Sequence, residues 1–205
     1  MIAVIGEKGA MRQLYDEQGV VHPSTEIRIP GCVVVAKRTR VTHGYEALQL
    51  GSGRVSKSTM NKPYAGHFKK AGVETFGMLR EVRVEKSDDY AVGQKLGVEL
   101  FQPGDKVSVA GRTKGRGFTG GMKRWGWHGG PGSHGSMSHR RIGSLGSGTS
   151  PGRVLPGRTL PGHYGVERVT VRNLRVIKIE PERGVLYVRG AVPGFEGSSV
   201  VVSKG

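Results

Sequence analysis

The amino-acid sequence predicts a mainly β protein, a small closed β-barrel with little helix that is interrupted by a long, extended insertion. Three observations carry this prediction. Short alternating apolar runs recur on both sides of residues 111–165. The segment between them holds 17 glycines, which supply no side chains to a core. Ten of the 32 Lys and Arg residues fall between Asp105 and Glu167, where the sequence has no Asp or Glu.

The apolar runs have the period of two that is typical of half-buried strands. In chain order they cover residues 26–29, 33–35, 47–50, 81–85, 96–101, 106–110, 169–171, 174–179 and 185–189. Residues 181–184 (Pro-Glu-Arg-Gly) predict a hairpin connection between the last two runs. A closed barrel must pair the C-terminal strands with the edges of the N-terminal ones. We therefore expect a discontinuous body, residues 1–110 and 166–205, with an inserted arm at residues 111–165.

Little else in the body departs from this pattern. The best helical candidate, residues 65–75, contains Gly66 and Gly72, so one or two turns or a basic loop are expected. The single cysteine, Cys32, is expected to be a small buried hydrophobic residue. No stretch reaches the roughly 20 apolar residues of a membrane span. The N-terminal apolar run is too short for a signal peptide, so we expect a soluble, cytoplasmic protein.

The charge of the insertion points to its partner. Ten cations without a carboxylate repel one another and favour a polyanion, of which nucleic acid is the commonest. Lys114 and Arg116 alternate with glycines, so that the backbone can approach phosphates closely. The glycine content predicts that the insertion is extended or disordered until it binds.

Aromatic and histidine side chains add to this hypothesis. Trp125 and Trp127 stand beside cations and can stack on unpaired bases, although Trp125 could equally pack on the barrel as an anchor. The four histidines of the segment lack the cysteine, carboxylate and rigid element of a zinc site. We expect these four to bond phosphate or 2′-hydroxyl groups, and we expect no metal or other cofactor: His128, His134, His139 and His163.

Two other classes of function remain open. Gly115, Gly117 and Gly120 match a dinucleotide-binding pattern, which would suit a nucleotide-dependent enzyme. No helix is expected to follow them, and the first acid after Gly120 is Glu167, far beyond the usual ~20 residues. The segment has no acid–base pair, so neither an enzyme nor a small-molecule substrate is expected. A sequence-tolerant DNA-binding protein fits the charge but lacks an evident groove-reading element.

Several motifs together resemble a known family over nearly the whole chain. The longest are Lys-Pro-Tyr-Ala-Gly-His-Phe-Lys-Lys-Ala-Gly-Val at residues 62–73 and Gly-His-Tyr-Gly-Val-Glu-Arg-Val-Thr-Val at residues 162–171. The others lie at residues 5–8, 111–125, 134–140, 151–154 and 190–194. With these motifs the sequence resembles the bacterial form of large-subunit ribosomal protein L3.

The resemblance implies a barrel body on the ribosome surface and an arm that threads through ribosomal RNA towards the peptidyl transferase centre. It also implies an early role in subunit assembly, with large-subunit ribosomal RNA and neighbouring ribosomal proteins as partners. The tip of the arm would span about residues 125–153. Some relatives carry a glutamine, methylated in some species, where Thr149 stands, so that modification cannot occur here.

Charge and resemblance together give a set of candidate RNA-binding residues. Lys69 and Lys70 form a separate candidate site on the body, for which the alternative is a solvated surface pair. The full set is Lys69, Lys70, Arg112, Lys114, Arg116, Phe118, Lys123, Arg124, Trp125, Trp127, His128, His134, His139, Arg140, Arg141, Arg153, Arg158 and His163.

Overall fold

The computed structural model describes residues 3–55 and 60–204. The chain divides into two compact units, a body (residues 1–113 and 168–205) and an inserted unit (residues 114–167). The predicted body also includes residues 1, 2, 56–59 and 205, which lie outside the described residues. No helix in the described ranges is long and apolar enough to cross a membrane.

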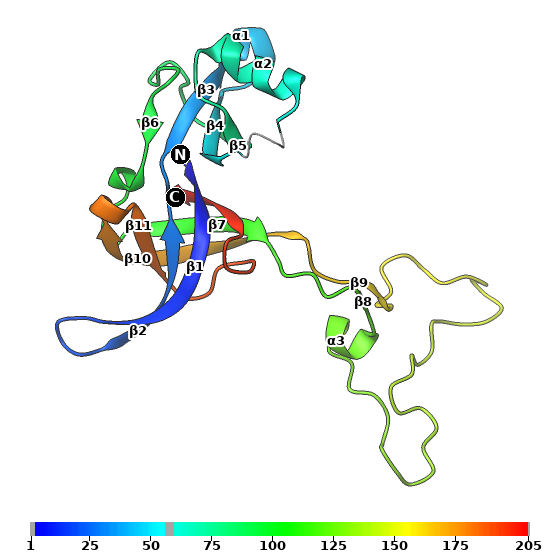
Figure 1. The fold of residues 1–205 in the computed structure, drawn as a ribbon. Coiled ribbons are helices and arrows are strands. Elements are labelled where there is room, and N and C mark those ends of the chain that lie inside the picture. The colour runs from blue at the N-terminus through cyan, green and yellow to red at the C-terminus, as the bar shows by residue number, and fades with distance from the viewer. Residues whose placement is uncertain (1–2, 56–59, 205) are drawn as a thin grey trace. The chain divides into compact units, whose positions relative to one another are not determined.

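The body contains nearly all of the regular structure (Figure 1). Its strands are β1 (Ala3–Tyr15), β2 (Val21–Arg28), β3 (Cys32–Arg38), β4 (Ala47–Arg54), β5 (Phe76–Arg83), β6 (Lys95–Leu96), β7 (Lys106–Arg112), β10 (Arg168–Glu180), β11 (Val185–Arg189) and β12 (Ser199–Lys204). Its helices are α1 (Arg40–His43) and α2 (Lys62–Ala71), with short 3-10 turns η2 (Val98–Leu100) and η3 (Pro181–Arg183).

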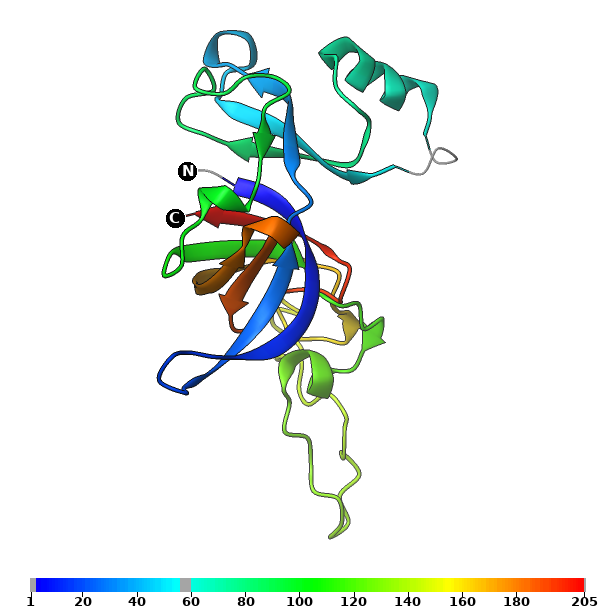
Figure 2. The same cartoon turned by 60° about the vertical axis from the view of Figure 1, so that its left-hand side comes forward.

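Six strands form a closed antiparallel barrel in the order β1-β12-β7-β10-β11-β2. The C-terminal strand β12 lies between β1 and β7, and β11 closes onto β2, so the predicted closure by C-terminal strands is confirmed. The β10–β11 hairpin also forms as predicted, with η3 at its turn. In Figure 2 the long, curved β1 crosses the front of the barrel and leads into the hairpin with β2.

A second sheet, with strand order β5-β4-β3-β6, was not separated from the barrel by the sequence pattern. Its buried residues nevertheless belong to the same apolar cluster as those of the barrel, which includes Val34 and Leu50 of this sheet and Val4 and Val109 of the barrel. Cys32 begins β3 and is fully buried, as predicted. Its Sγ lies 3.1 Å from the Ile5 amide nitrogen, and burial raises the pKa of the thiol.

Two local predictions were wrong. Residues 65–75 were expected to form turns or a loop, but α2 is a ten-residue helix that ends at Gly72, whose φ is +68°. Its buried Phe68 packs edge-on against Phe76, with ring centroids 5.9 Å apart, and this tertiary contact outweighs the weak local propensity. Residues 96–101 were expected to form a strand, but only Leu96, the last residue of β6, is in one. The 3-10 turn η2 follows, and Val98 and Phe101 are both buried.

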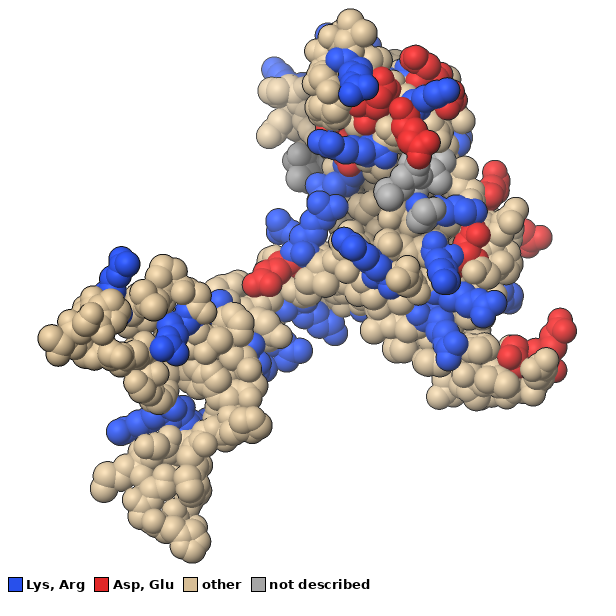
Figure 3. Space-filling view, turned by 180° about the vertical axis from the view of Figure 1, so that it is seen from behind, with Lys and Arg blue, Asp and Glu red and all other residues tan. Residues whose placement is uncertain are grey.

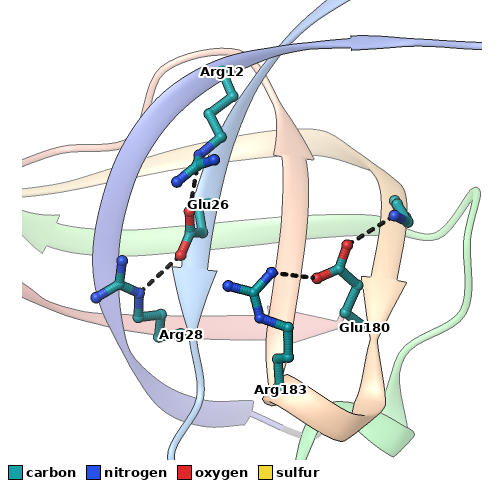
Figure 4. Close-up of polar contacts among 6 residues, drawn as sticks. Arg12, Glu26, Arg28, Glu180 and Arg183 are labelled. Carbon is teal, nitrogen blue, oxygen red and sulfur yellow. Dashed lines mark hydrogen bonds and ion pairs between the residues drawn. The ribbon is translucent and has the colours of Figure 1, made fainter.

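Several carboxylates of the body are paired with its cations. Glu26, whose side chain is only 4% exposed, lies between Arg12 (3.2 Å) and Arg28 (2.8 Å), as Figure 4 shows. Glu180 similarly bridges Lys178 and Arg183. These pairs partly neutralise the cations that they contact, which the inserted unit cannot do with its own residues before Glu167.

Leu186 tests the barrel core. It is fully buried on β11, opposite Ile27 and Ile179. Leu186→Ala should lower the free energy of unfolding by about 2–5 kcal/mol, because it removes buried methyl groups and leaves a cavity. Val41→Ala is the control, because Val41 is 96% exposed and its loss should cost at most about 0.5 kcal/mol. Urea unfolding of the full chain measures both, and equal costs would contradict the assigned core.

Candidate nucleic-acid interface

The inserted unit begins and ends in a short antiparallel ladder. Strand β8 (Phe118–Thr119) pairs with β9 (Gly162–His163). Arg116 N donates to Tyr164 O at 2.9 Å, and Tyr164 N donates to Gly117 O at 3.0 Å, which extends the ladder by one step. These bonds bring residues almost 50 positions apart in the sequence together, so both limbs of the unit are held at one place.

A five-residue helix, α3 (Gly121–Trp125), follows β8 and is tied to the returning limb at one carbonyl. Arg124 Nη1 and Trp125 Nε1 both donate to Leu160 O, at 2.9 and 2.8 Å. The Arg124 guanidinium lies 5.0 Å from the centre of the Trp125 ring. The absence of a side chain at Gly162 lets the Arg124 guanidinium lie close to the returning limb, because a Cβ there would overlap with Arg124 Nη1.

Trp127 is held on two sides. A Cβ at position 121 would overlap with its ring, so the absence of a side chain at Gly121 provides the space for the indole. On the other limb, Trp127 Nε1 donates to Thr159 Oγ1 at 3.4 Å. The indole therefore has a defined orientation, although it is only half-buried.

Beyond Trp127 the chain forms loops held by backbone bonds. Gly130 N donates to His139 O at 2.8 Å, and His139 Nδ1 lies 2.9 Å from Pro131 O. The residues that are buried in the whole inserted unit, all of which the structure describes, are Thr119, Gly121 and Gly165. The unit thus has hydrogen bonds but no apolar core of its own.

Electrostatically the inserted unit differs from the body. Residues 114–166 contain no Asp or Glu, but eight Lys and Arg residues. On the face that Figure 3 presents, blue side chains are scattered over this unit and nearly all red ones lie on the body. A cation in this stretch can therefore be neutralised only by a group from outside it.

Most of the predicted site residues lie in the inserted unit and are exposed. Fifteen of the eighteen fall between Lys114 and His163, whereas Arg112 is on β7 and Lys69 and Lys70 are in the last turn of α2. Sixteen are exposed, and Arg124 and Trp127 are half-buried. The structure thus brings Arg124, Trp125 and Trp127 together at the returning limb and leaves most of the other cations on the surface.

Two expectations for this segment need correction. The segment was expected to lack structure of its own, but β8, α3 and β9 give its root a defined geometry. No helix was expected after Gly120, but α3 begins at Gly121. A dinucleotide site still does not fit, because β8 pairs only with β9 in a two-stranded sheet and the first acid is still Glu167. No group of three or more His, Cys, Asp or Glu in the described ranges could hold a metal ion.

The residues that orient the others were not predicted from the sequence. Leu160 accepts two side-chain bonds through its carbonyl, and Thr159 accepts one through its hydroxyl. Gly121 and Gly162 provide space for the Trp127 ring and the Arg124 guanidinium. A backbone carbonyl or a missing side chain produces no recognisable sequence pattern. Only the abundance of glycine indicated that chain segments could approach one another this closely.

A closed β-barrel with an insertion that has eight cations and no carboxylate before Glu167 is typical of a basic protein that binds nucleic acid. The family model described as ribosomal protein L3 matches residues 54–185. The large ribosomal subunit protein uL3 of Carboxydothermus hydrogenoformans is 49% identical over 98% of this chain and 96% of its own length. The protein of the same name from Thermotoga maritima is 50% identical over 98% of this chain and 96% of its own length. The chain belongs to the ribosomal protein L3 family, which is structural and not enzymatic.

Substitutions at Gly121 and Gly120 test whether Trp127 packs against Gly121. In a chain with Trp125→Phe, where Trp127 is the remaining tryptophan, Gly121→Ala should displace the ring and shift its emission to longer wavelength as it becomes exposed. Gly120→Ala is the matched control, because a Cβ there meets nothing within 4 Å. Fluorescence spectra of the free protein measure both, and identical spectra for the two variants would contradict the packing of Trp127 on Gly121.

Proposed function

We propose that this chain binds large-subunit ribosomal RNA through its inserted unit, which acts as an arm extending into the RNA towards the peptidyl transferase centre. As a member of the ribosomal protein L3 family, the chain is a structural constituent of the large ribosomal subunit. It would work there in the bacterial cytoplasm, among neighbouring ribosomal proteins. Its contribution would be to order the RNA during early subunit assembly, without chemistry of its own.

One observation carries the proposal: the inserted unit has eight cations, no carboxylate before Glu167 and no apolar core. A protein segment of this kind gains little from its own packing and stores electrostatic repulsion. Phosphates around the segment remove the repulsion between its cations, and the counterions that each neutralised phosphate releases add a favourable free energy of binding. Exposed aromatic side chains such as Phe118, 81% exposed, then become available to unpaired bases.

The body contributes a second, smaller contact in this proposal. Lys69 and Lys70 are exposed in the last turn of α2, where the helix dipole favours cations even without RNA. Arg112 is exposed on β7, next to the point where the chain leaves the body. These side chains would neutralise phosphates without reading sequence.

Salt dependence tests the electrostatic part. If all ten cations between Asp105 and Glu167 met phosphates, the slope of log affinity against log salt would be about −7, as an upper bound. Lys114→Gln with Arg116→Gln should lower the magnitude of the slope by about one to two units. Filter binding of the full chain to extracted large-subunit ribosomal RNA measures this slope.

The control for these charge variants is Arg38→Gln, which removes a cation that is paired with Glu81 at 3.0 Å in the body. It should leave the slope unchanged. A wild-type slope near zero would contradict the proposal. Equal competition by duplex DNA would instead favour the DNA-binding alternative.

A shortened chain tests the role of the inserted unit in assembly. Arg112 and Arg168 are direct partners on β7 and β10, so residues 113–167 can be replaced by Asn-Gly, a two-residue hairpin turn. The shortened chain should unfold cooperatively, like the full chain, because the barrel core is intact. In cells that depend on it, large subunits should accumulate as incomplete particles in sucrose gradients. A shortened chain that fails to fold would contradict the arm as a separate insertion, and normal subunits would contradict its role in assembly.

A further inference from the structure

The inserted unit contains a cavity of about 390 Å³ that the family assignment does not explain. Its wall comes from three segments of the unit, near residues 127–130, 138–145 and 158–159. The volume lies within the roughly 300–1,000 Å³ that is usual for small-molecule sites. Six residues decide its chemistry: Trp127, Arg141, Ile142, Leu145, Arg158 and Thr159.

Trp127 gives the cavity a fixed aromatic wall. Its ring packs where Gly121 has no side chain, and its Nε1 is bonded to Thr159 Oγ1 at 3.4 Å. The indole is half-buried, so part of its surface remains available to a ligand. A ring that is already oriented loses little conformational freedom when another ring stacks on it.

The rest of the wall combines apolar and cationic groups. Ile142 and Leu145 are half-buried aliphatic side chains, whereas Arg141 and Arg158 are exposed. Because residues 114–166 contain no Asp or Glu, neither guanidinium finds a carboxylate in that stretch. A ligand that suits this wall has a flat, largely apolar ring and an anionic group beside it, and a nucleotide has both.

We propose that the cavity binds one unpaired nucleotide of the bound RNA, with its base stacked on Trp127 and its flanking phosphates on Arg141 and Arg158. The proposal rests on the proposed RNA-binding function and adds a specific site to it. Phosphate contacts elsewhere on the unit position the RNA, whereas this cavity requires a base that is free to leave its helix. It therefore selects a loop, bulge or junction rather than a continuous duplex.

The same chemistry could accept a free mononucleotide, and the test separates the two sources. The reference is the full chain with Trp125→Phe, so that emission comes from Trp127. Extracted large-subunit ribosomal RNA should quench this emission as it binds, because a stacked base quenches an indole. Adenosine monophosphate at the same nucleotide concentration should quench far less, since it lacks the rest of the interface.

Variants of the cavity provide a second measurement in the same background. Trp127→Leu should weaken RNA binding about ten-fold while the salt slope stays unchanged, because stacking is not a charge effect. Trp127→Phe keeps a ring and should retain most of the affinity, which separates lost stacking from a damaged fold. Arg141→Gln and Arg158→Gln should each weaken binding and reduce the magnitude of the salt slope by about one.

The possible failures are distinguishable. Salt-dependent RNA binding without quenching of Trp127, and with unchanged affinity in Trp127→Leu, would overturn the nucleotide cavity and leave the proposed RNA-binding function intact. Saturable quenching by adenosine monophosphate that ribosomal RNA does not displace would show a site for free nucleotides and also overturn it. If the wild-type chain showed no salt-dependent RNA binding, both proposals would fail.

Discussion

The ladder between β7 and β10 runs from the pair Lys106 and Arg175 to the pair Arg112 and Arg168. It closes the barrel and, at its far end, holds together the two points where the chain leaves the body and returns to it. The same hydrogen bonds therefore complete a core and fix the base of an insertion that has no core. An insertion placed between two paired strands costs the barrel little, since its ends are already neighbours.

The body and the inserted unit also differ in how their charges are distributed. In the body, acids such as Glu26 and Glu180 each hold two cations, and the hydrogen bond from Lys204, at 2.6 Å, lowers the pKa of Asp105. Residues 114–166 have cations only. A body whose acids and cations are interspersed around an apolar core is stable without a partner, whereas a cationic segment without a core gains stability from a polyanion. The fold thus combines a stable platform with a segment suited to RNA.

Glycine has two different roles in the inserted unit. Its conformational freedom matters at Gly165, where φ is +82° and a Cβ would overlap with the Lys114 carbonyl. At Gly121 and Gly162 the missing side chain matters instead, because Trp127 and Arg124 occupy that space. The cost of ordering such a chain is large, and the hydrogen bonds to Leu160 and Thr159 offset only part of it.

The sequence by itself determined the β-rich class, the burial of Cys32 and the cationic segment, because periodicity and charge are local properties of the chain. The closure of the barrel by C-terminal strands was predictable for another reason, because the exposed edges of the N-terminal strands must be covered. Only the tertiary structure decided that β1 is a long curved strand, that β3 to β6 form a separate sheet, and that α2 is a helix around the buried Phe68. In the candidate site, the sequence supplied the exposed cations and aromatics. The cavity required Trp127, Arg141 and Thr159 to come together from separate segments, and contacts between distant residues have no period that a sequence can display.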